Sequence, residues 1–202
     1  MVLGQSAATA AAHAIDQEVH VQQIDLAKLS ERLLADGQVL QWTGPRPAPA
    51  PQGRPTSDFP GIVIDDEQAK RLGFESMSYS AGPFVGSHYR HDGNAHAGLS
   101  AGTLEGNQSI QFSFRVPQTG RHEVRMAYSS HANRATNVPV QIAHADGTSA
   151  VIVNQRRPAK IEKLFEPLGT FLFRANTDYV IEVSNQNTDG YVIADAFQIV
   201  MP

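Results

Sequence analysis

Residues 109–116 alternate between apolar and polar side chains, and this period of two constrains the fold more than any other feature of the chain. One face of the stretch SIQFSFRV carries the apolar side chains Ile110, Phe112, Phe114 and Val116. Residues 122–129, HEVRMAYS, repeat the pattern, and PQTG at 117–120 is typical of a turn. Because successive side chains of a strand point to opposite faces, both stretches are predicted to be strands with one buried face.

The same period continues through the C-terminal part of the chain. Residues 138–154 form two alternating stretches around Asp146-Gly147, a strong hairpin signal. Further stretches with this pattern are GIVID at 61–65, LGTFLF at 168–173, DYVIEV at 178–183 and YVIADAFQIV at 191–200. About eight short strands with hardly any helix between them predict an all-β fold. We expect an antiparallel β-sandwich of the jelly-roll type, with a closed barrel as the alternative.

The N-terminal residues have a pattern typical of helices instead. Residues 25–37, DLAKLSERLLADG, place leucines on one stripe, with Asp25 as N-cap and Gly37 past the helix end. The leucines of this stripe are Leu26, Leu29 and Leu33. Residues 44–57, GPRPAPAPQGRPTS, contain five prolines and are expected to be an extended linker. The sequence therefore predicts a helical appendage at 1–43, a linker at 44–57 and the sandwich at 58–202.

Charge and composition exclude several classes of protein. The chain has 16 basic and 20 acidic residues and a formal net charge of −4, so a nucleic-acid or anionic-membrane surface is not expected. The absence of cysteine excludes disulfides, thiol catalysis and zinc–cysteine sites. No apolar run approaches the roughly 20 residues that span a bilayer. The start, MVLGQSAATAAAHAI, lacks the basic region and the continuous hydrophobic region of a signal peptide, so none is predicted. The sequence assigns no compartment, and an extracellular or periplasmic parent protein is compatible with it.

Two short motifs resemble catalytic or metal sites. GLSAG at 98–102 matches the G-x-S-x-G motif around a nucleophilic serine, here Ser100. That motif requires a strand-to-helix turn, and neither flank of GLSAG has such a pattern, so a glycine-rich loop is the better interpretation. His88, His91 and His96, together with Asp92, could ligate a metal, but a polar loop that faces solvent or substrate explains them better.

A set of polar and aromatic residues gives the candidate ligand site. Its members are Tyr89, His91, Asp92, Asn133, Arg134 and Asn137. Amide and guanidinium groups bond hydroxyls in pairs, and a tyrosine ring offers a flat face on which a sugar stacks. Two other tyrosines, Tyr128 and Tyr191, are expected to fill the core rather than to face a ligand.

Several blocks of sequence closely resemble one known family. These blocks are GFESMS at 73–78, NRATNVPVQIAHADGTSAVIVNQ at 133–155, LFEPLGTFLF at 164–173 and NTDGYVIADAFQIV at 187–200. In order and spacing they resemble the golvesin and xanthan-lyase C-terminal domain over about residues 60–202. The resemblance implies a carbohydrate-binding-like β-sandwich that serves as an accessory module in bacterial proteins.

The front segment is similar to another family. Residues 3–42, from LGQSAATAAAHAI to DGQVLQW, resemble the last stretch of FAD-dependent oxidoreductases, whose longer members carry this sandwich at their C-terminus. In those enzymes a turn before the helix faces the flavin, and Gly4, Gln5, Ser6 and Ala7 match it. Ala8 stands where the family usually has a further glycine, and the G-x-G-x-x-G half is missing. We therefore expect this chain to bind no FAD by itself.

Asp195 is the one residue that breaks the apolar face of the last strand. An unpaired buried carboxylate is costly, so Asp195 must be paired, hydrogen-bonded, metal-bound or protonated. We expect an ion pair with Arg134, whose forked guanidinium satisfies both oxygens. The alternatives are a calcium site shared with Asp65 or Asp66, or a hydrogen-bonded carboxylate at a sheet edge.

Three functions fit these observations. The resemblance implies first a non-catalytic module that holds polysaccharide. The second is a ligand-free domain that docks against an oxidoreductase domain, which predicts an exposed apolar patch on the helix at 25–35. The third is a fragment named after its parent activity, flavin oxidoreductase or xanthan lyase, although the chain contains neither set of catalytic residues. We predict the first, and therefore no enzyme activity in this chain.

Overall fold

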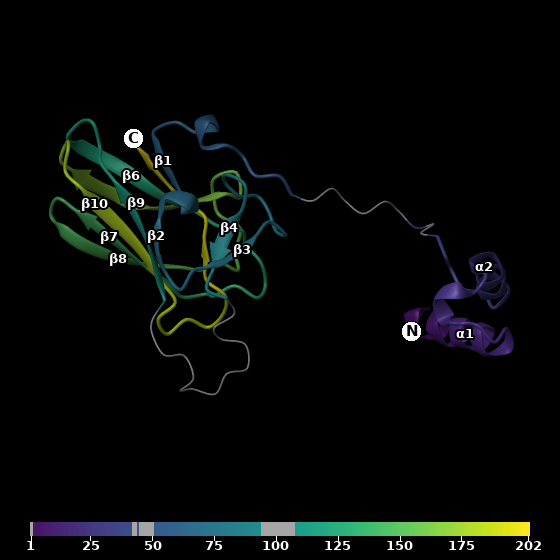
Figure 1. Ribbon diagram of the computed structural model, residues 1–202. Coiled ribbons are helices and arrows are strands. Elements are labelled where there is room, and N and C mark those ends of the chain that lie inside the picture. Colours follow the sequence, from purple (N-terminus) through teal and green to yellow (C-terminus); the bar gives the residue numbers. More distant parts are fainter. Residues whose placement is uncertain (1, 42–43, 45–50, 94–107) are drawn as a thin grey trace. The chain divides into compact units, whose positions relative to one another are not determined.

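The computed structural model describes residues 2–41, 44, 51–93 and 108–202 (Figure 1). The chain divides into two compact units, Met1–Ala48 and Pro49–Pro202. Within the described residues, no helix has both the length and the apolar character needed to cross a membrane.

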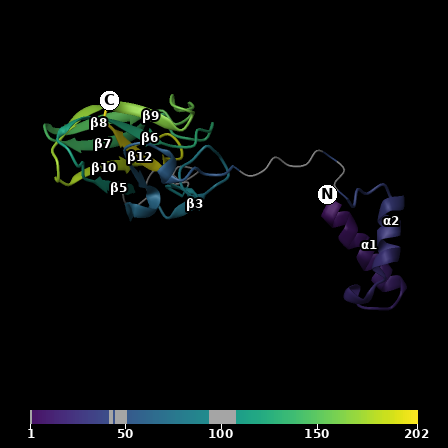
Figure 2. The ribbon, with the colours of Figure 1, turned by 90° about the horizontal axis from the view of Figure 1, so that it is seen from above.

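The first unit is a pair of helices that lie side by side (Figure 2). Its elements are α1 (Val2–Asp16), the 3-10 turn η1 (Val21–Gln23) and α2 (Leu26–Ala35). Asp25 caps α2 as expected, because its carboxylate accepts hydrogen bonds from the backbone amides of Ala27 and Lys28. The helix α1 already contains Gly4–Ala7, so the expected turn at these residues is wrong. The alanine-rich sequence, with its high helix propensity, continues the helix through them.

In the second unit, the described residues form strands and two short 3-10 turns. The strands are β1 (Ile62–Asp65), β2 (Lys70–Leu72), β3 (Ser76–Ser78), β4 (Tyr89–His91), β5 (Ser109–Phe114), β6 (Gly120–Ala127), β7 (Val138–His144), β8 (Gly147–Val153), β9 (Phe165–Phe173), β10 (Tyr179–Ser184), β11 (Ile193–Ala194) and β12 (Ala196–Val200). The turns are η2 (Thr56–Asp58) and η3 (Asp66–Gln68). Among the described residues of this unit, hardly any helix lies between the strands, as the sequence pattern predicted.

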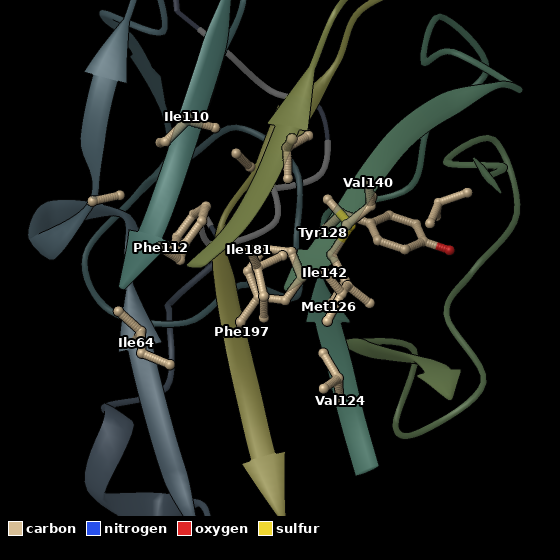
Figure 3. Packing of buried hydrophobic residues seen from close by; sticks show 14 of the residues in the cluster. Ile64, Ile110, Phe112, Val124, Met126, Tyr128, Val140, Ile142, Ile181 and Phe197 are labelled. Atoms are coloured by element: carbon tan, nitrogen blue, oxygen red, sulfur yellow. The ribbon is translucent and has the colours of Figure 1, made fainter. Parts of the chain in front are cut away.

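Two antiparallel sheets enclose the core. One has the strand order β1-β12-β6-β9 and the other β2-β5-β10-β7-β8, and a small third sheet has the order β11-β4-β3. The apolar faces of β5, β6 and β10 meet between the two large sheets (Figure 3). The Phe112 ring of β5 lies edge-on to the Phe197 ring of β12, with 4.8 Å between their centres. This arrangement confirms the predicted all-β sandwich with a short N-terminal helical part.

The last strand of the sequence pattern is split between two sheets. Ile193 and Ala194 pair with β4 in the small sheet, whereas Ala196 to Val200 lie between β1 and β6 in the four-stranded sheet. Asp195 is the single residue at the point where the chain changes sheets. Strands that switch sheets form the corners of a sandwich, so Asp195 lies at such a corner.

The second half of the expected linker is part of the folded unit. The backbone of Arg54 exchanges hydrogen bonds with Phe84 and Gly86, and its guanidinium lies 4.4 Å from the centre of the Phe59 ring. Gly53 is needed there, because a Cβ at that position would collide with the carbonyl of Gly86 and the ring of Phe84. The proline-rich composition therefore overstated the length of the free linker, since it hid these contacts.

Replacing Phe112 should be costly, because its side chain is fully buried between the sheets. We expect Phe112→Ala to lower the free energy of unfolding by roughly 3 to 5 kcal/mol, and Phe112→Leu by less. Leu72→Ala is the control, because that side chain is 67% exposed, and it should change stability little. Urea unfolding followed by far-UV circular dichroism measures the free energy of unfolding of all three variants. Equal effects of the Phe112 and Leu72 variants would contradict this packing.

Candidate functional site

Arg134 lies at the centre of a polar cluster under the loop at 129–137. Its Nε donates to the Ser129 carbonyl at 3.2 Å, and its Nη2 donates to the Tyr89 hydroxyl at 3.2 Å. Its Nη1 donates to Asn133 Oδ1 at 3.0 Å. These partners are neutral, and the guanidinium is only 7% exposed. The arginine thus fixes the loop from below and has little surface of its own.

Two ionisable side chains near Arg134, Tyr89 and His91, have pKa values below their ordinary values. Burial acts to raise the pKa of Tyr89, but hydrogen bonds with serine hydroxyls and the positive charge of Arg134 lower it overall. The serines are Ser78, Ser129 and Ser80. Burial lowers the pKa of His91, and the Arg134 charge adds to this against the opposing charge of Asp92. His91 is therefore a neutral imidazole at neutral pH.

Three side chains of this cluster reach solvent and form what we call the rim surface: His91, Asn133 and Tyr191. The His91 and Tyr191 rings lie edge to face, with their centres 5.8 Å apart, and both are half-buried. Asn133 is exposed, and its Oδ1 also contacts His131 Nδ1 at 2.8 Å. Its amide N–H groups have no partner among the described residues. The rim surface therefore combines aromatic faces with a free hydrogen-bond donor.

The structure brings five of the six predicted ligand residues together but buries three of them. Tyr89 and Asp92 are each 1% exposed, and Arg134 is nearly as covered, so the prediction that these three contact a ligand is wrong. The Asp92 carboxylate instead accepts hydrogen bonds from the backbone amide of Val192, at 3.2 Å, and from the side-chain amide of Asn185. The sequence pattern could not separate supporting from exposed polar residues, because both occur in loops.

Asn137, the sixth residue, belongs to a neighbouring network. Its Nδ2 donates to the Asn187 carbonyl at 2.8 Å, and its Oδ1 accepts the backbone amide of Asp189 at 3.0 Å. Thr136 and Arg156 donate to the carboxylate of the same Asp189, and the bonds from Thr136 lower its pKa most. Asn137 thus ties two loops together rather than facing a ligand. Tyr128 is in the core as expected, whereas Tyr191 is at the rim.

Asp195 does not pair with Arg134. Both of its oxygens accept a hydrogen bond from the backbone amide of Val85, at 3.2 and 3.0 Å, and Arg134 has other partners. Burial raises the pKa of Asp195 well above its ordinary value, and the nearby carboxyls of Asp65 and Asp66 act in the same direction. The predicted ion pair is therefore wrong, and Asp195 is a neutral carboxyl held by one backbone amide.

Two further buried carboxyls, those of Asp65 and Asp66, lie next to each other at the start of η3. Asp66 is fully buried, and neither of its oxygens accepts a hydrogen bond from a described residue. Burial, followed by the charge of Asp65, raises the pKa of Asp66 to about 8. Gly86, at φ +67°, lies against Asp65, where a Cβ would collide with the carboxylate. Asp66 therefore keeps its proton at neutral pH.

The acid cluster does not fit calcium. Within residues 2–41, 51–93 and 108–202, no three His, Cys, Asp or Glu side chains form a group suited to a metal ion. Asp66 Oδ1 has His88 Nε2 at 3.4 Å, and the charge of Arg90 also acts on it. The positive charge of Arg90 therefore acts on this carboxyl in the direction in which a calcium ion would act. His96 and the GLSAG serine, Ser100, lie outside the described residues.

A further feature, a cleft at the open edge of the sandwich, has no signal in the sequence. It has a volume of about 310 Å³ and lies between the end of β8 and the start of β9. Tyr128 forms part of its wall, and Arg157 and Lys160 bring two cationic groups. Its residues come from stretches that become neighbours only when the two sheets stack, so no local pattern predicts it.

The second unit is thus a β-sandwich module whose loops carry a polar and aromatic rim. A family model described as the golvesin C-terminal domain matches residues 81–201. Because this match covers more than half of the 202 residues, the chain belongs to the golvesin C-terminal domain family. This part of the predicted resemblance is confirmed.

Two relatives illustrate the family membership. A xanthan lyase of Bacillus sp. (strain GL1) is 28% identical over 158 residues, which are 75% of this chain and 16% of that protein. A solved xanthan lyase from Paenibacillus superposes with a TM-score of 0.59 and 32% identity over 69% of this chain. This chain spans only 13% of that structure, so it corresponds to a small part of both relatives. A family 35 carbohydrate binding module from Clostridium thermocellum, 11% identical, superposes over 68% of this chain and 95% of its own with a TM-score of 0.44.

The protonated Asp66 makes stability depend on pH. Folded Asp66 keeps its proton up to a pKa of about 8, whereas an unfolded aspartate loses it near pH 4. Its contribution to stability is therefore full below about pH 4 and is lost as the pH rises to about 8. Asp66→Asn replaces the carboxyl with an amide that is uncharged at every pH. We expect this variant to be more stable than wild type at pH 9, by roughly 2 kcal/mol, with a flatter pH profile.

Urea unfolding between pH 5 and pH 9 measures this difference. Asp178→Asn is the matched control, because Asp178 is exposed and its hydrogen bond with Arg115 lowers its pKa. The control should keep the wild-type slope across this range. An Asp66→Asn variant that kept the full slope, or that was less stable than wild type at pH 9, would show that Asp66 carries a charge when folded.

Proposed function

We propose that the second unit is a non-catalytic accessory module that binds polysaccharide. The observation that carries the proposal is the rim surface, where the Tyr191 and His91 rings lie 5.8 Å apart beside the exposed Asn133. Carbohydrate sites need an apolar face for the sugar ring and hydrogen-bonding groups for its hydroxyls. The rim surface offers both where β4 and the segments of Asn133 and Tyr191 meet.

The loops that carry this surface are held rigidly, which favours binding. The Ala135 amide donates to the Tyr191 carbonyl at 2.8 Å, and the Tyr191 amide donates to the Asn133 carbonyl at 3.1 Å. Arg134 ties the same loop to Tyr89 of β4. A ligand therefore meets side chains whose backbone is already ordered, so less entropy is lost on binding.

The relatives support the substrate class. Both matched proteins are named xanthan lyases, after an enzyme that acts on a polysaccharide. This chain corresponds to 16% and 13% of those proteins, so in a longer protein it would hold the substrate while another domain performs the reaction. We therefore assign the chain a binding role. A lyase or flavin oxidoreductase activity belongs to the rest of such a parent.

A docking role for the helical unit is the second candidate. Most of the exposed large hydrophobic side chains that the structure describes lie within Met1–Ala48. They are Ile15, Val19, Val21, Leu26, Leu34, Val39 and Leu40. Large exposed apolar surface marks an interaction site. We propose that this unit, as the tail of an FAD-dependent oxidoreductase, packs against the flavin-binding domain without binding FAD itself.

Loss of the Tyr191 ring should weaken polysaccharide binding. In native gels cast with xanthan, hydroxyethylcellulose or alginate, we expect the full chain to be retarded by at least one polymer. Tyr191→Ala should lower the apparent affinity roughly 3- to 10-fold, as expected for the loss of one stacking face. Tyr79→Ala is the matched control, because Tyr79 is 64% exposed outside the rim surface. A wild-type chain that no polymer retards would overturn the proposed function.

The docking proposal predicts an accessible apolar surface on the helical unit. The full chain should enhance the fluorescence of 1-anilinonaphthalene-8-sulfonate, and the double variant Leu26→Glu, Leu34→Glu should reduce this signal. The urea unfolding of the β-sandwich should stay unchanged, because both leucines belong to the helical unit. A full chain that does not bind the dye would show that this surface is covered in solution.

A further inference from the structure

The cleft between β8 and β9 is a built feature of the sandwich edge. β8 is the last strand of the five-stranded sheet, and β9 is the last strand of the four-stranded sheet. At one end the two edges are joined, because the Ala145 amide donates to the Leu172 carbonyl at 2.8 Å. At the other end they enclose the cleft of about 310 Å³. This volume is at the lower end of the range for small-ligand sites and suits one sugar unit.

The turn at one wall of the cleft is fixed from several sides. The Tyr128 hydroxyl donates to the carbonyl of Arg157 at 3.1 Å and contacts that of Asn154 at 3.5 Å. Figure 3 shows this hydroxyl pointing away from the rest of the core cluster. Burial, followed by the charge of Glu166, raises the pKa of Tyr128 to about 12, so the hydroxyl remains a donor at neutral pH.

Gln155 fixes the same turn to the last strand. Its Nε2 donates a hydrogen bond to the Ile193 carbonyl, and its Oε1 accepts one from the Ile193 backbone amide, both at 2.8 Å. Its backbone amide donates to the Ala135 carbonyl at 2.9 Å. Gln155 itself is fully buried, so the turn is anchored to the core. The side chains of Asn154 and Arg157 are therefore presented by a preorganised backbone.

The charges of the cleft favour an anion. Lys160 Nζ forms an ion pair of 2.5 Å with Glu166, which neutralises both groups. The guanidinium of Arg157 has no partner among the described residues, so the cleft keeps one free positive charge. The chain as a whole carries −4, and a polyanion is therefore repelled by the bulk of the surface. Attraction of an anionic polymer requires a local site such as this one.

The remaining lining offers apolar contact. Pro158, Pro167 and Leu168 contribute carbon surface to the cleft. A pyranose ring presents C–H groups on its faces and hydroxyls at its edge, so it fits walls of this kind with polar groups at their margin. A carboxylate on that ring would be recognised in a bidentate way by a free guanidinium.

We propose that this cleft is a subsite for one uronic acid unit of an acidic polysaccharide. Arg157 binds the sugar carboxylate, and Asn154 with the Lys160–Glu166 pair bonds ring hydroxyls. The inference rests on the proposed polysaccharide-binding function and adds its substrate class. Arg156 links the cleft turn to the loop that carries Asn133, because its Nε donates to the Arg134 carbonyl at 2.7 Å.

Native gels of the full chain with two polymers test this subsite. Sodium alginate is the polyuronate probe, and hydroxyethylcellulose is the neutral probe. We expect stronger retardation by alginate, and Arg157→Ala should lower the apparent affinity for alginate roughly 10-fold or more, as for a lost charge-assisted hydrogen bond. Affinity for hydroxyethylcellulose should change less than 2-fold. Arg174→Ala is the control with the same charge change, because Arg174 is exposed beyond the far end of β9.

The outcomes separate this inference from the proposed function. If alginate retards the wild type but Arg157→Ala and Arg174→Ala have equal effects, the subsite is wrong and the proposed function stands. Preference for hydroxyethylcellulose would likewise overturn the acidic class alone. No retardation by either polymer or by xanthan overturns both. Tyr128→Phe, which removes only the hydroxyl that holds the turn, should also weaken alginate binding while the urea midpoint shows a folded chain.

Discussion

The fold of the second unit depends on the hydrogen bond between the Val85 amide and the carboxyl of Asp195. Asp195 is the residue at which the chain leaves the small sheet and enters the four-stranded sheet. At such a corner the backbone of neighbouring segments loses its ladder partners, and a buried amide without a partner is costly. A side-chain acceptor satisfies the Val85 amide. Because burial keeps the carboxyl neutral, the corner does not enclose a bare charge.

This corner positions both proposed ligand surfaces. Two residues before Asp195, Ile193 exchanges two hydrogen bonds with the side chain of Gln155, which anchors the turn at the cleft. Two residues earlier, Tyr191 is bound by the loop that carries Asn133. The rim surface and the cleft therefore depend on one short segment of the chain. Their spacing is fixed by backbone hydrogen bonds and by the buried side chain of Gln155, which suits a module that holds an extended polymer.

The sequence predicted the long strands well, because their apolar faces are continuous and repeat at every second residue. It missed β2, β3 and β4, since three residues are too few to show a period. It identified Asp195 as anomalous but named the wrong partner. Val85 is 110 positions away and contributes only a backbone amide, which any residue other than proline has. The cleft had no signal either, because it exists only where two edge strands meet. Burial of Tyr89 and Arg134 was equally hidden, because neither a three-residue strand nor a loop has a period that distinguishes inside from outside.

The ionisation of Asp195 is the most direct test of this account. The side-chain carboxyl carbons of a ¹³C-labelled full chain can be followed by NMR across a pH titration, with Asp195→Asn used to assign the signal. The account predicts that Asp195 stays protonated well above the pH at which Asp178 ionises, because burial raises the pKa of Asp195 whereas Arg115 lowers that of Asp178. If Asp195 lost its proton together with Asp178, the carboxyl would be a buried anion, and a cation would have to hold the corner instead.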